Sequence, residues 1–185
     1  MARSRKTVQM AEIALMSAVI CIVAPFTIPV PASPVPLSVA TFVIYLAAIL
    51  LGAKQSAVCV LIYLLLGMVG LPVFSGFSGG IGVLLGPTGG YLAGYLPCAL
   101  IVGWMTNAKQ GNGSFLRNIG AMMLGTGACY FFGTIWFLAV MDGSYSVMQA
   151  LLLCVVPYLI FDLIKILAAA AVVVPIKKML RRMKQ

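Results

Sequence analysis

Long apolar runs alternate with short polar or helix-breaking stretches along the whole chain. The hydrocarbon core of a bilayer is about 30 Å thick, and a helix needs roughly 20 apolar residues to cross it. Runs such as "VLIYLLLG" do not alternate between apolar and polar positions, so they do not fit the strands of a β-barrel. The pattern predicts six transmembrane helices, over residues 8–28, 36–52, 56–71, 87–105, 118–140 and 147–175.

The composition indicates the same class of protein. Of the 185 residues, 63% are hydrophobic and only 8% are charged. A soluble domain has roughly 25% charged residues, so this chain could not cover a water-facing surface. The first apolar run continues toward Ile28 without a small-residue cleavage site, which indicates a membrane helix and not a removed signal peptide. We expect an all-α integral membrane protein that forms a single domain over residues 1–185.

The basic residues predict how the chain is oriented in the membrane. Cytoplasmic loops carry an excess of lysine and arginine. Eleven of the twelve basic residues fall on one side of the predicted spans: Arg3, Arg5, Lys6, Lys54, Lys109, Arg117, Lys177, Lys178, Arg181, Arg182 and Lys184. This side should be cytoplasmic, with both termini and the basic tail 176–185 on it. Such a tail is attracted to anionic membrane lipid, and we expect no nucleic-acid partner.

The stretch "GLPVFSGFSGGIGVLLGPTGGY", residues 70–91, contains eight glycines, two prolines and no charge. It separates the third and fourth predicted spans and falls on the extracytoplasmic side. Irregular backbone at membrane depth persists only where it is buried in protein or lines a water-filled cavity, and glycine allows close backbone approach. The stretch is longer than a turn between helices requires. It therefore favours a lid or binding loop over a passive turn.

Asp162 and Lys165 lie inside the sixth predicted span, where charged side chains are costly and usually mark a functional site. They are three residues apart and therefore share a helix face. Tyr158, four residues before Asp162, adds a third polar group, and Pro157 weakens the helix beside it. The alternative is a purely structural ion pair.

A ligand that engages both charges must offer donors to the carboxylate and an acceptor to the ammonium group. A cyclic urea does so, because two N–H groups flank one C=O. A carboxylate elsewhere on the ligand could meet backbone N–H groups of the glycine-rich stretch, or the helix N-terminus near "GPTGGY". Many other ligands would satisfy the same chemistry.

Three motifs together resemble the BioY family: the glycine-rich stretch, "IPVPASPVPLSVATF" and "PYLIFDLIK". The resemblance spans roughly residues 10 to 175. Members of this family are the biotin-specific binding (S) components of energy-coupling-factor (ECF) vitamin transporters in prokaryotic plasma membranes. The chain departs from the family at Ala40, where glutamine often precedes the threonine.

The resemblance implies a biotin site. Asp162 and Lys165 would bind the ureido group, and residues of the glycine-rich stretch would close over the acyl chain and carboxylate. The residues expected to bind biotin are Asp162, Lys165, Tyr158, Phe74, Gly79, Gly80, Thr88, Gly89, Gly90 and Tyr91.

The resemblance also implies partners: a transmembrane coupling subunit and two cytoplasmic ATPase subunits. The chain has no GxxxxGK[ST] phosphate loop, so ATP would be used by the partners only, and we expect no cofactor of its own. Ala14 and Ala18, one turn apart in "AEIALMSAVI", offer small-residue spacing that permits close helix approach. They are the expected docking site for the coupling subunit.

Two other classes of function are alternatives to a biotin-binding S component: a different transporter and an intramembrane enzyme. An S component for a different vitamin, or a small transporter working alone, would share the architecture. An intramembrane enzyme usually needs a histidine, a carboxylate cluster or a catalytic dyad; the chain has no histidine and three acidic residues. Its five cysteines occur singly in apolar runs, so we expect neither catalysis nor a metal site.

Overall fold

Helices occupy most of the apolar runs in the computed structural model, which describes residues 2–30, 33, 35–106 and 115–182. Two short strands, β1 (Thr27–Ile28) and β2 (Leu37–Ser38), pair antiparallel, and a 3-10 turn, η1, covers Ser75–Phe77. The helices are α1 (Ala2–Val23), α2 (Ala40–Leu51), α3 (Ala53–Met68), α4 (Ile81–Leu85), α5 (Gly89–Thr106), α6 (Phe115–Val140), α7 (Val147–Cys154) and α8 (Val156–Arg182). The mostly helical class is as predicted.

Several helix boundaries differ from the sequence expectation. The second predicted span begins in β2 and is helical only from Ala40, and the last helix continues beyond 175 to Arg182. The first helix ends at Val23 and not near Ile28, because the chain there turns into β1.

The last run, expected as one helix over 147–175, is divided at Val155, whose φ of -125° and ψ of -56° leave the helical range. Pro157 has no N–H to donate and is best accommodated in the first turn of a helix. Here it is the second residue of the new helix α8.

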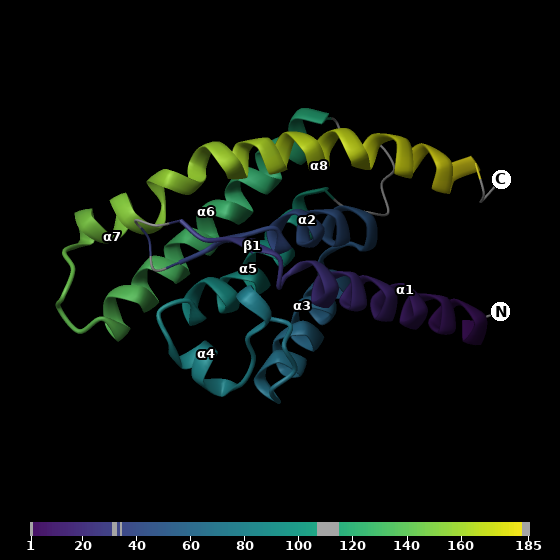
Figure 1. Ribbon diagram of the computed structural model, residues 1–185. Helices are drawn as coiled ribbons and strands as arrows, with labels where there is room; N and C mark the ends of the chain where they lie inside the picture. The colour runs from purple at the N-terminus through teal and green to yellow at the C-terminus, as the bar shows by residue number, and fades with distance from the viewer. Residues whose placement is uncertain (1, 31–32, 34, 107–114, 183–185) are drawn as a thin grey trace.

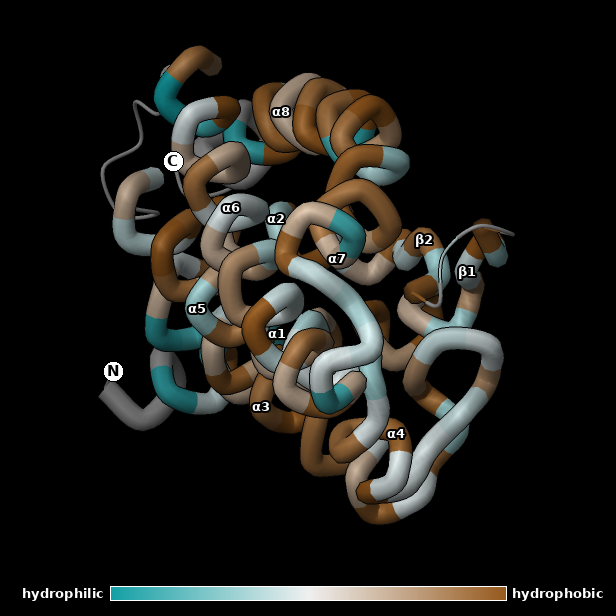
Figure 2. The backbone as a smooth tube through the Cα atoms, turned by 90° about the vertical axis from the view of Figure 1, so that its left-hand side faces the viewer, coloured by the Kyte–Doolittle hydropathy of each residue, from teal (hydrophilic) through white to brown (hydrophobic). Residues whose placement is uncertain are grey.

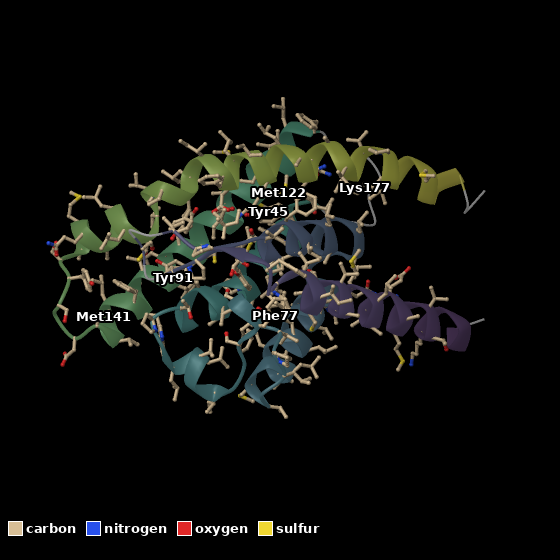
Figure 3. All side chains as sticks on the ribbon, viewed as in Figure 1. Tyr45, Phe77, Tyr91, Met122, Met141 and Lys177 are labelled. Atoms are coloured by element: carbon tan, nitrogen blue, oxygen red, sulfur yellow. The ribbon has the colours of Figure 1, made fainter. Side chains whose placement is uncertain are left out.

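The helices form a bundle in which α5 lies between α2, α3 and α6 (Figure 1). Helix α8 crosses the side formed by α2 and α6, and α1 packs on α3. Fully buried side chains, among them Tyr45 and Met122, fill the interior. Both chain ends lie at one end of the molecule, whereas α7 and α4 lie toward the other (Figure 1). Figure 3 places Lys177 toward the end with the termini and Met141 at the opposite one.

The outer surface of the helices is apolar. Among the described residues, three helical segments are long and apolar enough to span a membrane: Lys6–Val23, Phe115–Val140 and Val156–Lys177. Helices α2 and α3 are apolar but shorter. Helix α8 is drawn mostly brown in Figure 2, and Leu159, Ile160 and Ile164 on it are exposed. Exposed apolar surface of this extent marks contact with a membrane or a protein partner.

Candidate ligand-binding site

Helix α8 brings the two intramembrane charges together. Asp162 and Lys165 follow each other by one turn, and Lys165 Nζ lies 2.6 Å from Asp162 Oδ1. The two side chains are only 10% and 13% exposed, respectively. Opposite charges at this distance lower the cost of burying one another.

Side chains of α6 and α8 tie these charges to two other parts of the chain. The Tyr130 hydroxyl of α6 donates to Asp162 Oδ2. Lys165 Nζ donates to the carbonyl oxygen of Ser38 at 2.7 Å, and the Tyr158 hydroxyl donates to the carbonyl oxygen of Val35. Residues 35–38, which include β2 and are called here the 35–38 segment, are thus fastened to α8 at two points.

These groups surround one cavity between the 35–38 segment, α2, α5, α6, α7 and α8. Its walls combine the two charges with four tyrosines, a threonine and small or apolar side chains. The lining residues are Val35, Pro36, Leu37, Ser38, Thr41, Tyr91, Tyr95, Cys129, Tyr130, Cys154, Tyr158, Asp162 and Lys165. A mostly apolar pocket with a few convergent polar groups is the usual form of a small-molecule site.

The structure brings four of the ten residues expected to bind biotin to this cavity: Asp162, Lys165, Tyr158 and Tyr91. The Tyr91 hydroxyl lies 3.3 Å from Thr134 Oγ1, which fixes its direction. The role of these four in ligand binding stays a prediction, and the geometry places them where one small molecule could contact them all.

The other six expected residues are not among the residues that line the cavity in the described part of the chain. Phe74 is fully buried, and its ring centroid lies 5.4 Å from that of Tyr63. The Thr88 carbonyl accepts N–H bonds from the first turn of α5. The remaining four are the glycines Gly79, Gly80, Gly89 and Gly90.

These four glycines sit where backbone geometry leaves no room for a side chain or strains one. A Cβ at Gly79 would lie 2.3 Å from the carbonyl oxygen of Leu71. A Cβ at Gly89 would lie 1.7 Å from the carbonyl oxygen of Leu84. A Cβ at Gly90 would lie 2.1 Å from the Cβ of Trp136. Gly80 has a φ of +98°, at which any other residue would be strained. Close packing at Gly79, Gly89 and Gly90, and the positive φ at Gly80, therefore explain these glycines without a ligand.

Tyr130 and Thr41 were not singled out from the sequence. Each lies in a mostly apolar predicted span that also contains other hydroxyl residues, a pattern that is common in membrane helices. Their position at the cavity depends on how α6 and α2 pack against α8. The available signal for Tyr130 was its spacing: Thr126, Tyr130 and Thr134 are four residues apart and therefore place three hydroxyls on one face of the predicted span.

The two alanines expected to dock a partner lie on the free face of α1. Ala14 and Ala18 are exposed, whereas Ser17, Ile20 and Ala24 face the bundle and are buried. The alanine face is therefore not used for packing within the described part of the chain.

Fold and site together describe a helical protein with an apolar, membrane-type surface and a buried cavity that contains a charge pair. The BioY family model matches residues 1–182, and the chain belongs to that family. The biotin transporter BioY of Thermotoga maritima is 36% identical over 152 residues, which cover 82% of this chain and 86% of that protein.

Two further comparisons agree with this assignment. Biotin transporter BioY2 of Lactococcus lactis is 33% identical over 165 residues, 88% of this chain and 86% of that one. A solved structure, the S-component for biotin from an ECF-type ABC transporter, superposes with a TM-score of 0.86 at 27% identity and covers 96% of this chain and 95% of its own.

Proposed function

We propose that this protein captures biotin at the extracytoplasmic side of a prokaryotic plasma membrane, as the S component of an ECF-type uptake transporter. The observation that carries the proposal is the Asp162–Lys165 pair in the cavity of a BioY-family chain. The ureido group of biotin has two N–H donors beside one carbonyl acceptor, and the pair offers the complementary acceptor and donor side by side.

Both charged groups keep hydrogen-bonding capacity for a ligand. An ammonium group has three donors, of which Lys165 uses two, toward Asp162 and Ser38. A carboxylate has about four acceptor sites, and Asp162 uses one on each oxygen, toward Lys165 and Tyr130. The third N–H of Lys165 suits the ureido oxygen, and the free lone pairs of Asp162 suit the ureido N–H groups.

Equilibrium titration of biotin into the detergent-purified protein tests this function. Saturable binding of biotin, without binding of thiamine or riboflavin at the same concentration, is the expected result. Binding of another vitamin instead of biotin would show an S component of different specificity. Biotin uptake by cells that lack every coupling module would show a transporter that works alone.

For the membrane arrangement, we propose six crossings, made by α1, α2, α3, α5, α6 and the α7–α8 pair. This arrangement places both termini in the cytoplasm and the glycine-rich stretch outside, in agreement with the bias of the basic residues. Its support is the common end of the molecule at which both termini lie (Figure 1). Cysteines replacing Lys54 and Ser144 in a cysteine-free background test it: an impermeant thiol reagent should label the second position only, and the reverse labelling would invert the orientation.

For the partners, we propose a transmembrane coupling subunit on the Ala14–Ala18 face of α1 and two cytoplasmic ATPase subunits that supply all ATP chemistry. Ala14→Trp should weaken co-purification with the coupling subunit because it holds the helices apart, while biotin binding persists. Leu15→Trp, which replaces an already large exposed side chain on the same helix, is the control. Loss of biotin binding with intact assembly would show that this face packs internally.

A further inference from the structure

Thr41 is a buried polar side chain in the wall of the cavity. It is the second residue of α2, is 9% exposed and lines the same cavity as Asp162 and Lys165. Its Oγ1 is inaccessible to solvent and has no hydrogen-bond partner in the part of the chain that the structure describes. Burial of an unpaired hydroxyl is destabilising, so an unpaired group of this kind calls for an explanation.

The position of Thr41 in its helix explains why the hydroxyl is unpaired. Buried threonines in membrane helices usually donate to the carbonyl four residues earlier, and Thr106 and Thr126 do so here, to Val102 and Met122, each at 2.7 Å. Four residues before Thr41 the chain is in β2, at Leu37, and not in the helix. The local bond that satisfies the other two threonines is therefore not available to Thr41.

We propose that the Thr41 hydroxyl hydrogen-bonds the head group of the bound ligand, on the α2 side of the cavity, and so helps to select the ligand. This inference rests on the proposed function, with biotin as the ligand. A hydroxyl can donate as well as accept, so it can engage the ureido group beside Asp162 and Lys165. The ligand then supplies the hydrogen-bond partner that Thr41 does not have within its own helix.

Thr41→Val tests the proposal, because it keeps the side-chain shape and removes the hydroxyl. Affinity for biotin should fall roughly 3- to 10-fold, the range for one neutral hydrogen bond. The thermal unfolding midpoint of the ligand-free protein should stay unchanged or rise, because an unpaired buried group is removed. Weaker biotin binding without any loss of stability in the ligand-free protein is the result expected of a ligand contact.

Two further variants complete the experiment. Thr41→Ser and Thr41→Ala both lose the methyl group and differ only in the hydroxyl. Thr41→Ser should therefore bind biotin more tightly than Thr41→Ala, even if Thr41→Val does not fold. Thr106→Val is the matched control, since Thr106 is buried and lies outside the residues that line the cavity. It should leave biotin affinity unchanged.

The outcomes separate this inference from the proposed function. If the wild-type protein binds biotin and Thr41→Val binds it with equal affinity, the inference about Thr41 is overturned and the proposed function is not affected. Lower ligand-free stability of Thr41→Val with unchanged affinity would show that the hydroxyl bonds within the protein, which also overturns the inference. Failure of the wild-type protein to bind biotin would overturn the proposed function and the inference with it.

Discussion

The two most unusual parts of the sequence, the charged face of α8 and the glycine-rich stretch 70–91, are held in the fold in different ways. The charged face is joined to α6 and to the 35–38 segment by side-chain hydrogen bonds, from Tyr130, Tyr158 and Lys165. The glycine-rich stretch is held by backbone bonds, such as Gly80 N–H to the Gly67 carbonyl at 2.7 Å. The first region therefore places polar side chains at the cavity, whereas the second is connected mainly through its backbone. Substitutions should change affinity in the first and stability in the second.

The largest expected effect is on affinity, in the charged region. Asp162→Asn keeps the shape but replaces one acceptor oxygen by a donor facing the ligand N–H. Charge-assisted hydrogen bonds are the strong kind, so biotin affinity should fall by about 2–4 kcal/mol, or roughly 30- to 1,000-fold. The measurement is biotin titration after a folding check.

A matched control for this substitution exists in the chain. Asp142 is exposed in the turn after α6, and its positive φ of 39° suits asparagine. Asp142→Asn should bind biotin as the wild type does. Wild-type affinity in Asp162→Asn would reduce Asp162 and Lys165 to a structural ion pair.

The next effect is on stability, in the glycine-rich region. In Gly89→Ala the added Cβ would lie 1.7 Å from the Leu84 carbonyl oxygen, so the backbone must shift. We expect a loss of about 3 kcal/mol in the free energy of unfolding, the upper part of the usual range for overpacking, and a lower thermal midpoint. The protein that remains folded should bind biotin with nearly wild-type affinity.

Gly82→Ala is the control for this region, because no heavy atom lies within 4 Å of the added Cβ. Its thermal midpoint should match that of the wild type. Unchanged stability of Gly89→Ala together with a large loss of affinity would contradict the comparison, since it would mean that the stretch contacts the ligand itself.

The mostly helical class could be predicted from the sequence because its cause is local. A run of apolar residues forms a helix at membrane depth whatever it packs against, and Asp162 and Lys165 were conspicuous because charges are rare there. Pro157 was expected to weaken the last helix, but the full division at Val155 and the β1–β2 ladder were not predicted. The ladder pairs Thr27 with Ser38, and such pairing depends on how the consecutive helices α1 and α2 place the two ends.

The same reasoning explains what could be predicted of the candidate site. Residues on one helix, Tyr158, Asp162 and Lys165, could be grouped from their spacing alone. Tyr130 and Thr41 join them only through the packing of three helices, which no local pattern reveals. The glycines were expected to allow close backbone approach, and the geometry at Gly79 and Gly89 agrees, whereas a role of the stretch as a lid over the ligand stays a prediction.

A smaller effect on affinity is expected from the hydroxyl that orients Asp162. Tyr130→Phe keeps the ring and removes the donor to Asp162 Oδ2. A hydrogen bond to a charged group contributes about 1.5 kcal/mol at the low end of its range, so biotin affinity should fall roughly 10-fold. Tyr145→Phe, whose ring packs on Phe137 outside the cavity, should have no effect. Equal affinities for both variants would show that Asp162 is oriented without Tyr130.

The smallest effect on affinity is expected at Tyr158, whose hydroxyl bonds to the backbone of the 35–38 segment and not to a charged group. Tyr158→Phe removes the donor to the Val35 carbonyl, while Lys165 still holds the Ser38 carbonyl. A neutral hydrogen bond contributes about 0.5–1 kcal/mol, so biotin affinity should fall roughly 2- to 5-fold. Because the segment is then fastened at one point and not two, its amide hydrogens should exchange faster in the ligand-free protein. Hydrogen exchange measured by mass spectrometry over residues 35–38 checks this, with α3 as the internal reference. A larger loss of affinity without faster exchange would mean that the Tyr158 hydroxyl contacts the ligand directly, and the charged face of α8 would then extend one turn further into the site.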